Sequence, residues 1–345
     1  MPARPLDLPP ASASGIGSLP GTEPLEAVPL PLTMLPGLPY LPELPARGPG
    51  ADMIGRAFGI LAELYVTLAP SGWRFAEHAG RDHRRAQGYL HQDLDALEER
   101  GQDYEGVIKV QVAGPWTLAA MVELHHGDKA LSDHGACRDI AASLAEGLRE
   151  HVAEVRKRLP LSTGVVVQLD EPALPAILDG TVRTASGFGT LRAVEANDAE
   201  SALRSVVEIL GADGIPVLAH CCAERTPVGV LRRAGFAGLA LDLGLLPEVA
   251  DDDLGELVES GAILLAGLVP ALDPPGRGGL SPLADTVAPV RELWNRLGLP
   301  VAALARVVPV PTCGMAGASP AHARAATQRC ADAARTLADL ADGGE

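Results

Sequence analysis

The stretch Gly164-Val165-Val166-Val167-Gln168-Leu169-Asp170-Glu171-Pro172 decides the fold. It is short, apolar and rich in β-branched residues, and it stops abruptly at two acidic residues. A continuous apolar run of this length is typical of a strand buried on both faces, as in a parallel sheet. Similar runs occupy residues 106–112, 215–219, 238–241, 262–267 and 301–308.

Segments with helical spacing separate these strands and predict an α/β protein. They cover residues 51–68, 85–100, 137–159, 199–210, 228–234, 248–260, 288–297 and 321–341, and Pro115 opens a further helix. Two more strands are predicted at residues 14–18 and 30–34, which gives the eight units of a (β/α)₈ TIM barrel. We expect residues 1–345 to form a single barrel domain, with residues 1–14 loose. A doubly wound open sheet is the alternative, but the sequence has no GxGxxG motif to support it.

Residues 19–50 are crowded with proline, which blocks helix interiors. The segment is also apolar, with Leu30, Leu32, Met34 and Tyr40 as candidates for burial. We therefore expect a long, extended β1–α1 loop wrapped over the body of the barrel.

The composition narrows the range of functions. Of the 345 residues, 47% are hydrophobic and 21% are charged, which is enough for a sizeable core. The net charge of −16 argues against nucleic acid and against an anionic membrane surface as partners. No apolar run reaches about 18 residues, the length of a membrane span. The N-terminus lacks the pattern of a signal peptide, so we expect a cytoplasmic protein whose cysteines are thiols or metal ligands.

Polar side chains stand where the apolar strands end. Asp170 and Glu171 close one strand, His220, Cys221 and Cys222 close another, Asp242 closes a third, and Cys313 follows the last. In a barrel the carboxyl ends of the strands share one face, and that face holds the active site. Residues far apart in the sequence are therefore expected to converge there.

His220 and Cys222 are two residues apart, so along a strand their side chains point the same way and that of Cys221 points away. One imidazole and two thiolates suit Zn²⁺, with a fourth position left for a carboxylate, water or substrate. Buried cysteine as core filler is the alternative. Cys313 at a further strand end favours the metal, whereas we expect Cys221 to be filler.

The acidic residues leave alternatives open. Asp242 is a candidate oxygen ligand of the same metal, a helix N-cap, or a hydrogen-bond partner of His220. Asp170 and Glu171 point to opposite sides, so only one of them faces the mouth of the barrel. That residue is a candidate for pairing with a substrate amino group or for proton transfer, and a helix start before Pro172 is the other interpretation.

Five motifs occur in an order that resembles a known family. They are Gly15-Ile16-Gly17-Ser18-Leu19-Pro20, Ala113-Gly114-Pro115-Trp116-Thr117-Leu118, Gln168-Leu169-Asp170-Glu171-Pro172, His220-Cys221-Cys222 and Pro311-Thr312-Cys313-Gly314. Together they resemble the catalytic C-terminal barrel of cobalamin-independent methionine synthase. The wider superfamily includes uroporphyrinogen decarboxylase and the corrinoid-dependent thiol methyltransferases. The resemblance spans about residues 12–340.

The resemblance implies a catalytic zinc ion that binds a thiol and presents it as a thiolate to a methyl donor. The implied metal ligands are His220, Cys222, Cys313 and, at the position of a family glutamate, Asp242. Ile16, Ser18 and Asp170 are implied to contact an amino-acid substrate. Trp116 and Thr117 are candidates for lining the donor side of the site.

Two family features are absent at their expected places. The family's His-Gly-Glu segment falls on residues 46–50, which contain neither His nor Glu. The family's late catalytic His falls on residues 267–273, where Asp273 is the candidate to replace it. The resemblance is to the C-terminal barrel alone, whereas full-length methionine synthase carries a second, N-terminal barrel.

The sequence therefore predicts a zinc-dependent thiol S-methyltransferase of methionine biosynthesis, acting on homocysteine or a related small thiol. Its methyl donor is expected to be a methylfolate or a methyl-corrinoid protein. Two alternatives remain. One is a degenerate, non-catalytic barrel with structural zinc. The other is a decarboxylase resembling the porphyrinogen branch, for which Arg47 is the one obvious basic candidate near the mouth.

Overall fold

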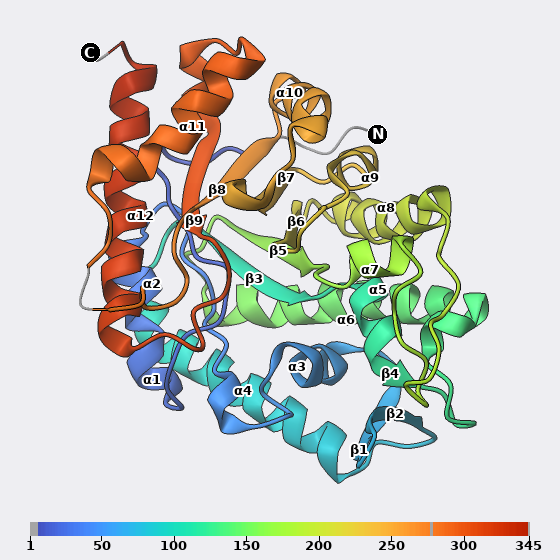
Figure 1. The fold of residues 1–345 in the computed structure, drawn as a ribbon. Coiled ribbons are helices and arrows are strands. Elements are labelled where there is room, and N and C mark those ends of the chain that lie inside the picture. Colours follow the sequence, from blue (N-terminus) through green and yellow to red (C-terminus); the bar gives the residue numbers. More distant parts are fainter. Residues whose placement is uncertain (1–5, 277–278, 344–345) are drawn as a thin grey trace.

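A six-stranded parallel sheet forms the centre of the computed structural model, which describes residues 6–276 and 279–343. Its strand order is β3-β5-β6-β7-β8-β9, and the sheet curls into a half-barrel (Figure 1). The bounds are β3 Val107–Ala113, β5 Gly164–Asp170, β6 Val217–Cys221, β7 Gly238–Asp242, β8 Ile263–Val269 and β9 Val307–Pro311. Five of the six strands predicted from residue 106 onward are confirmed, whereas the predicted strand 301–308 is corrected, because residues 301–306 form a 3₁₀ turn and the strand begins at Val307.

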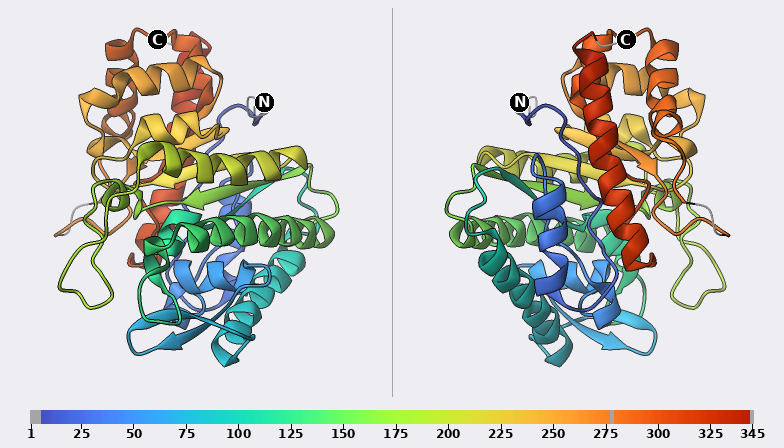
Figure 2. Two further views of the ribbon diagram at one scale, coloured as in Figure 1. Left: turned by 90° about the vertical axis from the view of Figure 1, so that its right-hand side faces the viewer. Right: turned by 90° about the vertical axis from the view of Figure 1, so that its left-hand side faces the viewer.

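Helices follow the strands and pack along the outside of the curled sheet (Figure 2). They are α4 Arg81–Gly101, α5 Pro115–Met121, α6 His134–Arg158, α7 Leu174–Leu178, α8 Ala196–Ala212, α9 Val228–Arg233, α10 Asp251–Glu259, α11 Leu283–Leu297 and α12 Pro320–Ala341. Short 3₁₀ turns lie at Ala130–Ser132, Leu243–Leu245, Glu248–Ala250 and Val301–Arg306. No helix in the described part of the chain has the length and apolar character needed to cross a membrane.

The predicted closed barrel of eight regular strands is wrong. Between β9 and β3 lie two extended segments, residues 14–18 and 39–43, which form isolated bridges of one or two hydrogen bonds instead of a ladder. Ser14 N donates to Pro309 O at 3.2 Å, and Leu41 N donates to Lys109 O at 3.0 Å. The physical reason is proline, because Pro39, Pro42 and the β9 residue Pro309 have no N–H to donate to a ladder.

Two expectations for the proline-rich segment are also corrected. Residues 30–34 are not a strand, because they belong to the helix α2 Pro29–Met34, and residues 39–43 take the predicted place in the barrel. Nor is the segment extended throughout, since it also contains α1 Pro24–Ala27 and the 3₁₀ turn Pro45–Arg47. Each of these helices starts with proline, whose missing N–H and fixed φ suit the first helical position.

The predicted helix at residues 51–68 ends early. The helix α3 covers Met53–Ile60, and the chain then forms the hairpin of β1 Tyr65–Ala69 and β2 Gly72–Ala76, which pairs with β4 Val122–Glu123. Alternation of side chains in Tyr65-Val66-Thr67-Leu68 favours a strand over a helix. The pairing agrees, because Val66 lies opposite Phe75 in the antiparallel register of β1 and β2.

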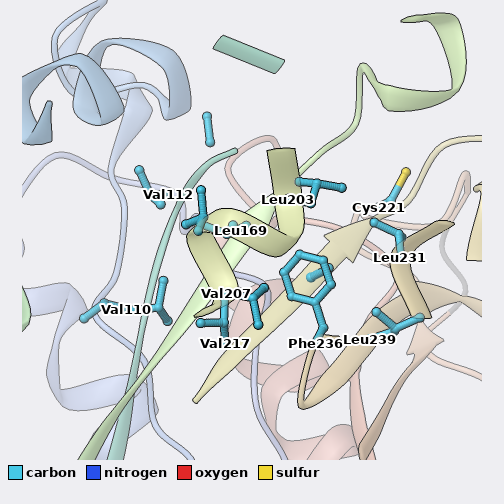
Figure 3. Packing of buried hydrophobic residues seen from close by; sticks show 14 of the residues in the cluster. Val110, Val112, Leu169, Leu203, Val207, Val217, Cys221, Leu231, Phe236 and Leu239 are labelled. Carbon is cyan, nitrogen blue, oxygen red and sulfur yellow. The ribbon is translucent and has the colours of Figure 1, made fainter. Parts of the chain in front are cut away.

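The core has one layer on each face of the curled sheet. The outer layer lies between sheet and helices, where Val217, Cys221 and Leu239 pack with Leu203 and Val207 of α8 (Figure 3). The inner layer fills the barrel with the side chains of Val166, Leu218, Ala240, Leu265 and Val308. Strand residues therefore alternate strictly between the two layers, which decides where the polar residues point.

A buried ion network lies beside α3 and α4. Arg56 of α3 pairs with Asp93 of α4 and lies 3.7 Å from a carboxylate oxygen of Glu43. Arg47 also pairs with Asp93, at 2.7 Å. All four side chains are nearly inaccessible to solvent, so each charge depends on its neighbours for stabilisation.

Replacement of Asp93 by Ala is expected to destabilise the fold. It would leave two buried guanidinium groups without their shared partner, which costs about 3–5 kcal/mol in comparable cases. Urea unfolding measures the loss. The matched control is Asp213→Ala, which removes an exposed partner of Arg149 and should change the unfolding midpoint little. Equal effects of the two substitutions would contradict a buried network.

Candidate metal centre

The inward face of the sheet becomes polar at its carboxyl end. In β5 the inward residues run from Val166 through Gln168 to Asp170, and in β6 Leu218 is followed by His220. Asp170 and His220 are paired neighbours in the β5–β6 register. The side chains that end these strands therefore meet at one place, as the parallel arrangement predicts.

Three metal-ligating side chains converge at this end. One ligand atom from each of His220, Cys222 and Cys313 lies within 4.8 Å of the others. The Sγ atoms of Cys222 and Cys313 are 2.8 Å apart, although 91 residues separate the two in sequence. This is the sole such group found among residues 6–276 and 279–343.

Backbone contacts hold the ligands in place. His220 Nδ1 lies 3.2 Å from the Ala240 carbonyl oxygen of β7, an acceptor that favours a proton on Nδ1 and leaves Nε2 for a metal. Cys313 follows β9 in a loop that is tied to β8, because Thr312 N donates to Val269 O at 2.8 Å. The ligands thus come from two chain segments, the end of β6 and the loop after β9, and each segment is tied to a neighbouring strand.

Electrostatics divide the two thiols. The hydrogen bond from Cys222 and the contact with His220 together lower the pKa of Cys313, against the effect of burial. The same hydrogen bond, with burial, raises the pKa of Cys222. Burial lowers the pKa of His220, but its hydrogen bond to Cys313 and the nearby charge of Asp170 outweigh this and raise it. Of the two cysteines, Cys222 therefore keeps its proton and Cys313 is the thiolate. The thiolate is the form of cysteine that ligates metals.

The donor set fits Zn²⁺. One imidazole nitrogen and two thiolate sulfurs are borderline and soft ligands, and zinc sites with three protein ligands keep a position open for water or substrate. The described residues supply these three ligands in one partly buried group.

Asp242, the predicted fourth ligand, lies outside this group. Its Oδ1 accepts a hydrogen bond of 2.9 Å from Gly244 N, which caps the turn Leu243–Leu245. Burial raises its pKa, and the charges of Cys313 and His220 reach it. Asp242 thus makes the N-cap contact that the sequence analysis gave as an alternative to metal ligation.

The two acids after β5 point to opposite sides, as expected. Asp170 faces inward, where its Oδ1 accepts a hydrogen bond of 2.7 Å from Gln168. Burial raises the pKa of Asp170 to about 6, against the effects of His220, Gln168 and Lys109. Glu171 instead caps α5, accepting hydrogen bonds from Trp116 N, Thr117 N and Thr117 Oγ1 at 2.7–2.9 Å.

Trp116 and Thr117 are engaged elsewhere. The Thr117 hydroxyl donates to Glu171, and the Trp116 indole donates to the Ala199 carbonyl oxygen at 3.0 Å. Both side chains are buried. The structure therefore places the two predicted donor-side residues in the α5–β5 and α5–α8 contacts and does not bring them into the metal group.

Ile16 and Ser18 lie close to the metal group. Ser18 O accepts a hydrogen bond of 2.9 Å from Met315 N, two residues after Cys313. Gly314 allows this approach, since a Cβ there would lie 2.2 Å from the Ser18 hydroxyl oxygen. The Ile16 side chain packs in the inner layer of the barrel. Both predicted substrate contacts thus belong to the same mouth as the cluster.

Glu43 is a candidate that the sequence analysis missed. It ends the closing segment 39–43, is 4% exposed, and one of its carboxylate oxygens has no hydrogen-bond partner. Burial raises its pKa to about 7, and the charges of Arg56, Asp170 and Lys109 reach it. The available signal was an acidic residue in the otherwise apolar run Tyr40-Leu41-Pro42-Glu43-Leu44.

Asp273 has a structural contact of its own. Its carboxylate accepts hydrogen bonds from Ser319 N and Ser319 Oγ at 2.6–2.7 Å, next to the start of α12. These bonds lower its pKa. Asp273, the predicted replacement for the family's late catalytic His, thus contacts the start of α12 and is not part of the group of three metal-ligating residues.

Comparison with known proteins supports the fold. No protein-family model and no curated protein matches the chain. A solved B12-independent methionine synthase from Shewanella sp. W3-18-1, in complex with selenomethionine, is similar with a TM-score of 0.59 and 14% identity, covering 95% of this chain and 98% of that one. A 2,3-dimethylmalate lyase of the PEP mutase/isocitrate lyase superfamily gives a TM-score of 0.37 at 12% identity, covering 86% and 74%. At 14% identity, the similarity to the methionine synthase shows a shared fold and no more. The similarity to the lyase is too weak to show a shared fold.

Substitution of Cys313 by Ser is expected to abolish zinc binding, because it removes one of three ligands. We expect about one zinc per wild-type chain and less than about a tenth in the variant, measured by elemental analysis after purification in zinc. Cys330→Ser is the matched control, since Cys330 is a buried thiol in α12 outside the group. Full zinc content in the Cys313 variant would contradict the assignment.

Proposed function

We propose that this chain is a zinc-dependent thiol methyltransferase that acts like the catalytic core of cobalamin-independent methionine synthase. The observation that carries the proposal is the convergence of His220, Cys222 and Cys313 at the carboxyl end of the sheet. The fold shared with a B12-independent methionine synthase supports it. Methionine biosynthesis is the corresponding pathway.

The three residues would hold the zinc ion and leave one position open. A bound zinc ion lowers the pKa of a thiol, so that a substrate thiol, normally near pKa 8.5, becomes a nucleophilic thiolate at neutral pH. His220, fixed by the Ala240 carbonyl, and Cys313, fixed by the β9 loop, would give the site a rigid geometry. Rigid ligands hold the sulfur where a methyl donor can approach it.

The carboxylates of Asp170 and Glu43 would hold the amino group of an amino-acid thiol. Both are buried near Lys109, and the charge of Asp170 raises the pKa of Glu43. An ammonium group between them would favour the ionised form of both. This pairing supports homocysteine or a related amino-acid thiol, with Ile16 and Ser18 beside it.

The methyl donor is proposed to be a methylfolate or a methyl-corrinoid protein. In either case the substrate sulfur forms a bond to the methyl carbon while the donor's bond to that carbon breaks, and the thiol proton is released. As the alternative to pairing with the amino group, Asp170, whose charge raises the pKa of His220, is the candidate acceptor for that proton.

Two alternatives fit the geometry less well. A structural zinc site is closed by four protein ligands, whereas the group in the described residues has three. A decarboxylase of the porphyrinogen type needs cationic side chains free to bind carboxylates. Arg47, its one candidate, is buried and paired with Asp93.

Replacement of Asp170 by Asn tests the role of this carboxylate. Loss of one charge-assisted hydrogen bond costs about 1.5–3 kcal/mol, so the affinity for homocysteine should fall by about tenfold or more. Affinity is measured on cobalt-substituted protein from the thiolate-to-cobalt absorption band. The affinity for 2-mercaptoethanol, which has no amino group, should change by less than about threefold in the same variant.

Asp242→Asn serves as the control, because Asp242 is an acidic residue near the three metal-ligating residues that caps a turn through Gly244. It should bind both thiols like the wild type. If Asp170→Asn lowered the affinities for homocysteine and for 2-mercaptoethanol equally, Asp170 would act on the metal ligands and not on the amino group.

A further inference from the structure

Lys109 is a buried lysine that the proposed chemistry does not use. It lies in the middle of β3 and its side chain points inward, with no exposure to solvent. Its Nζ donates to Ile16 O at 3.0 Å and to Gln111 Oε1 at 3.4 Å, and lies 5.4 Å from the centre of the Tyr40 ring. Burial lowers the pKa of this ammonium to about 8, and the charges of Asp170 and Glu43 oppose that shift. A charge placed there at such a cost requires an explanation.

The Ile16 carbonyl is held from two strands at once. Gln168 Nε2 of β5 donates to the same oxygen at 2.9 Å, and it also donates to Asp170 Oδ1 at 2.7 Å. The segment 14–18 has few ladder bonds of its own, as described above. Lys109 and Gln168 therefore supply side-chain hydrogen bonds where a regular barrel strand would have backbone ones.

Two residues after Ile16, at Ser18, the segment 14–18 contacts the loop that carries the ligand Cys313. Ser18 O accepts the hydrogen bond from Met315 N, and the Ser18 side chain lies against Gly314. Gly314 directly follows the ligand Cys313. A continuous set of contacts thus runs from Lys109 through Ile16 and Ser18 to the loop that carries Cys313.

We propose that Lys109 is a positioning residue of the metal centre, which together with Gln168 fixes residues 16–18 and through them the Cys313 loop. The effect on zinc rests on the proposed function, whereas the effect on residues 16–18 does not. Outer contacts of this kind change metal affinity by about 10–100-fold in other metalloproteins.

The test uses Lys109→Met in the full chain, because Met keeps the length of the side chain and removes the ammonium. Amide hydrogen exchange should become faster in residues 12–22 and 312–316, with and without zinc, and stay unchanged in α6 and α8. Zinc affinity, measured by competition with a chelating dye, should fall by about tenfold. Ser162→Ala is the control: the part-buried Ser162 hydroxyl also lies within hydrogen-bond distance of backbone carbonyls, Gly106 O and Gly164 O, but at the opposite ends of β3 and β5. Ser162→Ala should change neither the amide exchange of residues 12–22 and 312–316 nor the zinc affinity.

The outcomes separate the two proposals. Unchanged exchange at residues 12–22, or faster exchange spread evenly over the chain, would overturn the role of Lys109. If Lys109→Met fails to fold, Gln168→Leu removes the second donor to Ile16 O and must give the same local pattern. Wild-type protein that binds no zinc would refute the proposed function, while the exchange comparison in the zinc-free protein would still decide the role of Lys109.

Discussion

The incomplete closure of the barrel is the constraint on which the rest of the structure depends. Prolines at 39, 42 and 309 remove the donors that a regular strand pair needs, so the sheet stops at six strands. Polar side chains from β3 and β5 fill part of this gap by binding the carbonyl oxygens of Ile16 and Leu41. The barrel interior is therefore apolar at one end and hydrogen-bonded at the other.

That polar end is also where the chemistry of the chain is concentrated. The alternation of side chains sends Asp170, His220 and Cys222 inward and Cys221 into the outer core. Because the strands are parallel, these positions lie at one edge, where the loop after β9 adds Cys313. One geometric rule thus brings together residues from three separate segments, and the closing segments add Ser18 and Glu43.

Much of this was predictable from the sequence. Five of the strands are continuous apolar runs that end in conspicuous polar residues, so both these strands and the convergence of His220, Cys222 and Cys313 followed directly. Asp242 shows the limit of such reasoning. An acidic residue at a strand end serves equally as a metal ligand or as a cap, and the hydrogen bond from Gly244 shows the cap contact alone.

The proline-rich segment could not be predicted in the same way. Proline excludes helix interiors but suits helix starts, so Pro24 and Pro29 are compatible with both an extended loop and the short helices observed. Glu43 escaped notice for the same reason, because its strand-like position is created by Lys109 and Gly17, which are distant in sequence. Tertiary contacts, and not local pattern, determine where this segment lies.

The central claim is that the metal centre has an open position for a thiol. The most direct test is X-ray absorption at the zinc edge of the wild-type protein, recorded without thiol and with homocysteine. We expect two sulfur neighbours, from Cys222 and Cys313, without thiol, and three when homocysteine is present. A zinc ion whose sulfur neighbours do not change, or a protein that binds no zinc, would contradict it.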